Sequence, residues 1–162
     1  MEEIERFVKW AEENGWMVQR RNTNELELPQ DVILRYSNIS NEYKQFLTFV
    51  DTCIAPDEKS WFLCLNDYKG IGDSAYRWNE VEKMCLYEAE DDDEWKEEIT
   101  QFWDTHLSIL FSVRSGYTYY ALDTESELGA IVSGYEPEFE ETDMIASGFF
   151  EFLDKIMNGI EL

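Results

Sequence analysis

Two acidic runs contain closely spaced carboxylates, the side chains in this sequence that could take part in metal-dependent chemistry. The carboxylates are Asp91, Asp92, Asp93 and Glu94 in the first run and Glu136, Glu138, Glu140 and Glu141 in the second. Clustered carboxylates can bind a divalent cation, as in a metal-dependent hydrolase. Neither run has the Asp-x-Asp-x-Asp-Gly pattern of a calcium loop, and a solvated charged face is the commoner outcome for such runs. We therefore predict no metal site and keep the hydrolase as a lesser alternative.

His106 and the three cysteines are the other groups with catalytic potential. A histidine base needs a positioned nucleophile and an orienting partner, and no Gly-x-Ser-x-Gly elbow surrounds any serine in the chain. Cys53, Cys64 and Cys85 are widely spaced and form no Cys-x-x-Cys pair, which favours reduced, mostly buried thiols over a zinc site. The sequence predicts no catalytic residue, no cofactor and a protein that is not an enzyme.

The charge of the chain limits its partners. Its 162 residues include 36 acidic and 13 basic side chains, for a formal net charge of −23. Binding to nucleic-acid phosphates requires an excess of lysine and arginine, so we expect no direct nucleic-acid contact and favour a basic protein partner. Solubility alone is the alternative explanation of the charge. Because the sequence shows neither an apolar targeting segment nor a membrane-length apolar run, we expect a cytoplasmic protein without a membrane partner.

Aromatic residues are numerous, with six Trp, nine Tyr and ten Phe. Trp and Tyr are enriched at the desolvated centres of protein interfaces. Trp10, Trp61, Trp78 and Tyr120 lie off the main apolar stripes and are candidate anchors, although they could simply complete an aromatic core. We predict partner contact through Trp61, Trp78 and Tyr120, with the two acidic runs as contact surface or rim.

The last third of the chain has the clearest strand signals. Residues 107–113 alternate apolar and partly polar side chains, and residues 117–122 are rich in aromatics. The Ser115-Gly116 turn between them predicts a hairpin. Residues 129–135 predict a third strand, in which Gly134 suggests a bulge or a close backbone approach. The simplest arrangement is a three-stranded antiparallel meander.

Apolar residues at helical spacing predict amphipathic helices around these strands. Helices are predicted over residues 2–14, after Pro29, and over residues 40–50, 78–89, 95–103 and 149–158. Ser40 and Ser147 are candidate caps of two of them. Residues 60–65 predict a buried strand. Without repeats or a break in composition, residues 1–162 are predicted to form a single α+β domain, an antiparallel sheet with amphipathic helices packed against it.

Several packing motifs occur in a distinctive order along the chain. They are Leu28-Pro29, Tyr43-Lys44-x-Phe46-Leu47, the strand at Trp61, Gly116-Tyr117, Leu122-Asp123 and Ile145-Ala146-Ser147-x-Phe149-Phe150-Glu151-Phe152-Leu153. In this order, from about Leu28 to Ile156, the chain resembles the SUKH superfamily (SMI/KNR type). It departs from the family pattern at Thr52 to Lys59, which contains no glycine. These motifs concern packing, so they bear on the fold more than on the target.

The resemblance implies a cytosolic, non-enzymatic bacterial immunity protein that neutralises a polymorphic toxin, often a nuclease. Nuclease domains are usually basic because they hold phosphates, so a strongly acidic partner could cover that surface. The family also includes regulatory scaffold proteins in eukaryotes, so the fold alone leaves the role open. We expect an immunity-type binding protein with a toxin domain as partner, and keep a regulatory or scaffold protein of the same fold as the alternative.

Overall fold

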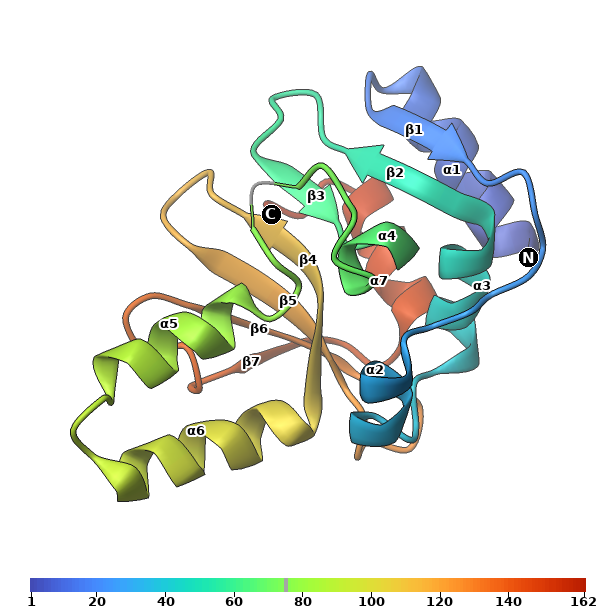
Figure 1. Ribbon diagram of the computed structural model, residues 1–162. Coiled ribbons are helices and arrows are strands. Elements are labelled where there is room, and N and C mark those ends of the chain that lie inside the picture. Colours follow the sequence, from blue (N-terminus) through green and yellow to red (C-terminus); the bar gives the residue numbers. More distant parts are fainter. Residues whose placement is uncertain (75) are drawn as a thin grey trace.

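A seven-stranded antiparallel sheet forms the middle of the computed structural model, which describes residues 1–74 and 76–162 (Figure 1). The strands follow one another across the sheet in chain order: β1 (Met17–Arg20), β2 (Val50–Ile54), β3 (Ser60–Phe62), β4 (His106–Ser112), β5 (Thr118–Asp123), β6 (Ile131–Tyr135) and β7 (Asp143–Ala146). The predicted α+β class is confirmed. The strand predicted over residues 60–65 is present as β3, which ends at Phe62. The sheet also contains β1, β2 and β7, which were not predicted because strands of four or five residues are too short for a clear alternation.

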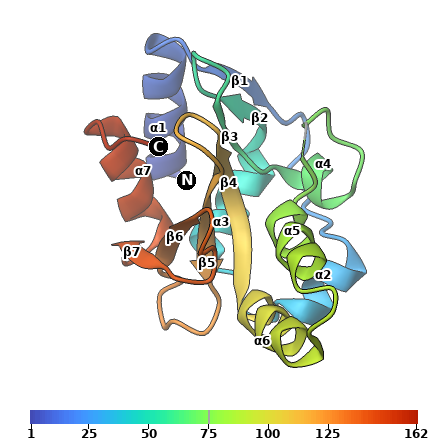
Figure 2. The same cartoon turned by 90° about the vertical axis from the view of Figure 1, so that its left-hand side faces the viewer.

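Helices cover both faces of the sheet (Figure 2). On one face lie α1 (Glu2–Glu13), α3 (Asn41–Phe49) and α7 (Phe149–Met157), and on the other α4 (Leu65–Tyr68), α5 (Glu80–Glu88) and α6 (Asp93–Asp104). The short helix α2 (Gln30–Arg35) belongs to the connection between β1 and β2. Because both faces are covered, every residue of β4 after His106 is buried, including the serines of its partly polar side.

The core on the α1–α3–α7 face is aromatic. Phe46 packs against Phe62 of β3 and Phe149 of α7, with ring centroids 4.9 and 5.3 Å apart, and Phe7 of α1 lies 5.7 Å from Phe62. The predicted apolar face of α7 is confirmed, because Phe149, Phe152, Leu153 and Ile156 are all buried. The opposite face has its own aromatic layer, in which Tyr119 lies 4.8 Å from Trp103 of α6. The strand and helix patterns thus bury one continuous set of side chains.

One of the two predicted helix caps is confirmed and the other is wrong. Ser40 caps α3 as predicted, because its Oγ accepts a hydrogen bond from the backbone N–H of Tyr43 at 3.3 Å. Ser147 was predicted to cap α7, but Gly148 occupies that position. Glu42 replaces the missing cap, because it accepts from Phe150 N in the first turn at 2.9 Å. Glu151 accepts from Ser147 N at 2.7 Å and so ties the first turn to the residue before the cap. Negative charge at a helix N-terminus also complements the helix dipole.

Glu151 should make the stability of α7 depend on pH. Hydrogen bonds from the hydroxyl and N–H of Ser147, with a further contribution from Lys155, lower the pKa of Glu151 from 4.5 to about 2. Because the carboxylate is favoured in the folded state, its contribution is complete above its ordinary pKa and is lost as the pH falls toward 2. We expect Glu151→Ala to lower the urea midpoint at neutral pH, and the difference from wild type to shrink as the pH falls below about 4.5. A pH-independent difference would contradict this account.

Candidate partner-binding groove

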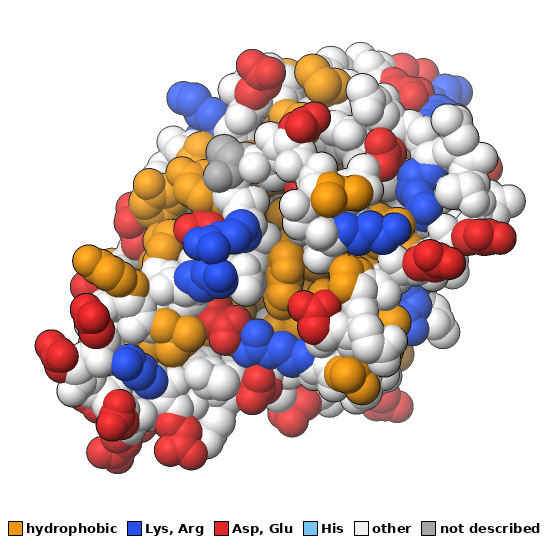
Figure 3. Space-filling view, viewed as in Figure 1, with side chains coloured by type: hydrophobic (Ala, Val, Ile, Leu, Met, Phe, Trp, Pro, Cys, Tyr) orange, Lys and Arg blue, Asp and Glu red, His pale blue; other side chains and the backbone are white. Residues whose placement is uncertain are grey.

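A surface groove of ≈ 770 Å³ lies between α5, the start of α6 and the connection from β6 to β7. We call it the α5 groove. Its lining comprises Arg77, Glu80, Lys83, Met84, Cys85, Tyr87, Glu88, Trp95, Tyr117, Glu136, Pro137, Phe139 and Glu140. Hydrophobic side chains and carboxylates alternate over the α5 and α6 region, at the left of Figure 3, with lysine and arginine among them.

Helix α5 presents one face to this groove. Glu80, Lys83, Met84, Tyr87 and Glu88 are spaced i, i+3, i+4, i+7 and i+8, which places them along one side of a helix. Of the buried residues of α5, Val81 and Glu82 lie outside the groove lining, whereas Cys85 also borders the groove. The sequence therefore gives α5 two functional sides: one packs on the sheet and the other lines a surface groove.

Aromatic side chains in the groove are exposed to an unusual degree. Tyr87 is 75% exposed, Trp95 44% and Tyr117 40%. Trp95 is held at the first turn of α6 because Asp92 caps that helix and accepts from Trp95 N at 3.0 Å. Exposed aromatics that converge on one hollow are typical of protein interfaces, since they bury a large apolar area at a small cost in side-chain entropy.

The two acidic runs predicted as contact surface both adjoin the α5 groove. Glu136 and Glu140 line it directly, and residues 91–94 form the turn and first helical residues between Glu88 and Trp95. Glu138 and Glu141 are exposed on the same connection. Arg77, a basic lining residue, is paired with Glu80 at 3.1 Å. The structure therefore brings together two segments that are more than forty residues apart in the sequence.

The fold-back of the β6–β7 connection is what shapes this side of the groove. Gly134 lies so close to that connection that a Cβ there would be 2.5 Å from the Phe139 carbonyl oxygen and 2.6 Å from the Tyr119 hydroxyl. Tyr119 donates a hydrogen bond to the same carbonyl. The predicted close approach at Gly134 is confirmed, and it allows Phe139 to pack on the sheet while Glu140 reaches the groove.

Glu140 combines a buried oxygen with a neighbouring thiol. Its Oε1 is buried and has no hydrogen-bond partner among the described residues. Burial, followed by the nearby Glu140 carboxylate, raises the pKa of the Cys85 thiol. Cys85 is therefore a neutral thiol at neutral pH, and burial also raises the pKa of Cys53 and Cys64. All three cysteines are free and buried, as predicted.

The structure places the predicted aromatic anchors outside the α5 groove. Tyr120 is 5% exposed, packs on Phe152 at 5.2 Å and donates to the carbonyl of Glu161 at 3.2 Å, so it is a core residue and its prediction as a surface anchor was wrong. Trp78 is partly buried against Tyr36, 6.1 Å away. Trp61 is 9% exposed and lines a different cavity.

Sequence reasoning missed the aromatics that do line the groove. Trp95 falls at helical spacing with Ile99 and Trp103, which predicts a shared buried face, but only Ile99 and Trp103 are buried. Tyr87 stands off the stripe that contains Val81 and Cys85, and that displacement was the available signal. The exposure of Tyr117 depends on the turn after β4 and on the fold-back of residues 136–142, which no local pattern specifies.

Local hydrogen bonds and ring stacking hold the side chain of His106. Its Nδ1 lies 2.8 Å from the carbonyl oxygen of Phe102 and 3.0 Å from Thr105 Oγ1, and its ring stacks on Phe102 with centroids 4.0 Å apart. Ser108 and Ser112 nearby are buried. Within residues 1–74 and 76–162, three or more His, Cys, Asp or Glu side chains nowhere form a group that could hold a metal ion.

Comparison of the chain with protein-family models, with curated proteins and with solved structures gave no match. The likeness to the SUKH superfamily therefore rests on the motifs in the sequence. A separate observation concerns membranes: in the described part of the chain, every helix is too short or too polar to cross a bilayer.

Proposed function

We propose that this protein is a non-enzymatic, immunity-type binding protein of the SUKH kind, which neutralises a basic toxin domain such as a nuclease. The contact surface in this proposal is the α5 groove. One observation carries it: exposed Tyr87, Trp95 and Tyr117 share a groove that both acidic runs adjoin. The motif resemblance and the net charge of −23 support the same function.

Charge and aromatic content would have different roles in this binding. The acidic rim and the net charge would attract a basic partner over distances up to about 8–10 Å at physiological salt and raise the association rate. The aromatic side chains would supply most of the affinity, because desolvated Trp and Tyr dominate interface energetics. A partner that covers these residues with basic side chains around them would match both features.

Co-purification from cells that co-express a panel of basic toxin domains tests the proposal. We expect the tagged protein to capture a toxin, and washing at high salt to weaken that complex. The variants Tyr87→Ala and Trp95→Ala should each reduce affinity roughly 30-fold, which corresponds to about 2 kcal/mol. Leu34→Ala and Leu128→Ala are matched controls, because these side chains are 74% and 68% exposed and lie outside the groove.

Two double variants with the same change in charge separate the effect of the groove carboxylates on association from the effect of net charge. Glu88→Gln with Glu136→Gln removes two carboxylates that line the groove, whereas Glu125→Gln with Glu127→Gln removes two from the β5–β6 loop at the other end of β6. Only the first pair should slow association markedly. Equal slowing would show that net charge alone attracts the partner, and a toxin complex insensitive to all groove variants would contradict the proposed surface. Capture of no toxin would favour the scaffold alternative.

A further inference from the structure

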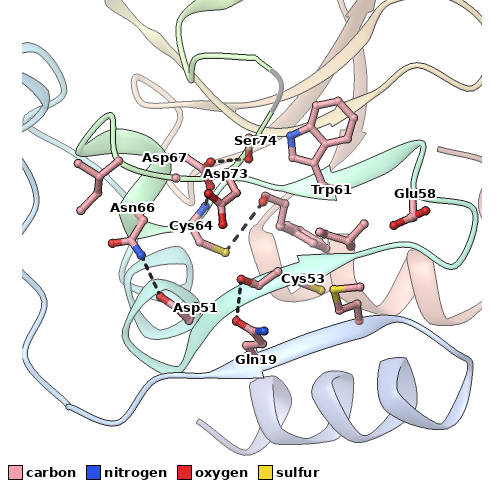
Figure 4. A pocket seen from close by; sticks show the side chains of 16 residues that line it. Gln19, Asp51, Cys53, Glu58, Trp61, Cys64, Asn66, Asp67, Asp73 and Ser74 are labelled. Atoms are coloured by element: carbon pink, nitrogen blue, oxygen red, sulfur yellow. Dashed lines mark hydrogen bonds between the residues drawn. The ribbon is translucent and has the colours of Figure 1, made fainter.

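A second cavity, ≈ 460 Å³ in volume, lies between β2, β3 and the loop that follows α4 (Figure 4). We call it the acidic cavity. It shares no residue with the α5 groove, and its volume falls within the about 300–1,000 Å³ that small-ligand sites occupy. Its lining comprises Met17, Gln19, Asp51, Thr52, Cys53, Ile54, Glu58, Trp61, Phe62, Cys64, Asn66, Asp67, Ile71, Gly72, Asp73 and Ser74.

Four carboxylates from different segments line this cavity. Asp51 belongs to β2, Glu58 to the β2–β3 turn, Asp67 to α4, and Asp73 to the loop after α4. Among the residues that the structure describes, the lining includes no lysine or arginine, and none of the four carboxylates takes part in an ion pair. A concave site with this charge favours a cation.

Trp61 provides an independent observation that points to a ligand in the acidic cavity. The side chain is 9% exposed, and its buried Nε1 has no hydrogen-bond partner in the described structure. The indole ring of Trp61 is held in place by stacking on Tyr76, with ring centroids 5.8 Å apart, and by an edge contact with Phe111. The nitrogen lies on the side of the ring toward Ser74 and Asp73 (Figure 4). An unpaired buried donor is costly, so an acceptor oxygen on a ligand would be favourable there.

Hydrogen bonds hold the wall of the cavity in place. Asp67 accepts from the backbone N–H of Cys64 at 2.7 Å and from the Ser74 hydroxyl at 2.5 Å, which fastens the loop to α4. Gly72 approaches so closely that a Cβ there would be 2.7 Å from Asp67 Oδ1. Asp51 accepts only one long hydrogen bond, from Asn66 Nδ2 at 3.4 Å (Figure 4). With Asp67 fully engaged, Asp51 and Asp73 are the carboxylates that keep the most capacity to receive a ligand.

We propose that the acidic cavity binds a guanidinium group of the arginine type, with a neighbouring carbonyl oxygen that accepts from Trp61 Nε1–H. A guanidinium presents five N–H donors in a planar fork, so it can reach carboxylates on different segments, here Asp51 and Asp73. An ammonium is a compact point charge that suits one carboxylate at a time. The same chemistry is offered by an arginine residue within a polypeptide and by a free arginine-like metabolite.

The test uses N-acetyl-arginine N-methylamide as a probe with the full-length protein and needs no toxin. We expect it to shift the Trp61 indole N–H resonance, assigned with Trp61→Phe, and to give a saturable calorimetric titration. The corresponding citrulline derivative has the same shape without the charge and should bind at least about tenfold more weakly. Comparison with free arginine separates the two sources: tighter binding of the amide indicates a polypeptide, and tighter binding of free arginine a metabolite.

Variants of the lining locate the binding. Asp51→Asn and Asp73→Asn should each weaken the probe about tenfold, because each removes a charge-assisted hydrogen bond, whereas Glu125→Gln should have no effect. Equal binding of the citrulline derivative, or no change of the Trp61 resonance at millimolar probe, would overturn the proposal. Since neither result involves the α5 groove, failure here leaves the proposed toxin binding untouched, and the reverse also holds.

Discussion

Replacing Arg35 with methionine is expected to lower the free energy of unfolding by about 3 kcal/mol. The guanidinium of Arg35 donates two hydrogen bonds of 2.8 Å to Glu82 and a third of 3.0 Å to Asp104, so it joins α2 to α5 and α6. Glu82 is only 7% exposed. The hydrogen bond to Glu82 is the main reason why the pKa of Arg35 is raised, and without it a carboxylate would be buried and unpaired.

Urea unfolding of single and double variants checks this prediction. Glu82→Met alone should cost less than Arg35→Met, because the remaining guanidinium keeps Asp104 and some contact with water. The double variant should be more stable than Arg35→Met, since replacing both members of a buried pair by apolar residues is often nearly neutral. Additive costs in the double variant would show that the pair is energetically independent, against our interpretation.

Gly134→Ala is expected to destabilise the fold by about 3 kcal/mol, the upper part of the range for overpacking. The new Cβ would meet the Phe139 carbonyl at 2.5 Å and both the hydroxyl and Cε1 of Tyr119, at 2.6 and 2.8 Å. Tyr119 is fully buried and cannot move without disturbing Trp103. The β6–β7 connection must therefore shift, and because it forms one wall of the α5 groove, partner binding should weaken as well.

Thermal or urea unfolding measures the stability change, and Gly159→Ala is the matched control. Gly159 has a φ of +90° but nothing within 4 Å of an added Cβ, so its substitution reports backbone strain without crowding and should cost only about 1 kcal/mol. Adding Tyr119→Phe to Gly134→Ala should not restore stability, because the clash with the Phe139 carbonyl persists. Full rescue would mean that the hydroxyl alone limits the space.

Elements with long periodic patterns were predictable from the sequence, and elements made by tertiary contacts were not. The helices at both ends of the chain and the β4–β5 hairpin follow apolar spacing and turn residues, and all are present. Strands β1 and β7 are only four residues long, so pairing across the sheet defines them more than local pattern does. Gly148 could replace Ser147 as the cap because Glu42, more than a hundred residues away, supplies the acceptor.

The sequence allowed the acidic residues of the candidate groove to be predicted, but not its exposed aromatic residues. The acidic runs are visible in the sequence, but their convergence depends on the fold-back that Gly134 permits. Tyr120 follows Tyr119 in the same strand, so the two side chains point to opposite faces, and helices cover both. An aromatic count cannot tell such a residue from Tyr87, whose exposure depends on which side of α5 packs against the sheet.

Hydrogen exchange of the protein alone and in complex with a captured toxin domain tests the central claim most directly. If the α5 groove is the contact surface, amides in α5, in the first turn of α6 and in residues 136–141 should exchange more slowly in the complex. The β5–β6 loop with Glu125 and Glu127, at the other end of β6, should exchange as in the free protein. Protection confined to other surfaces, with the groove unchanged, would contradict the account.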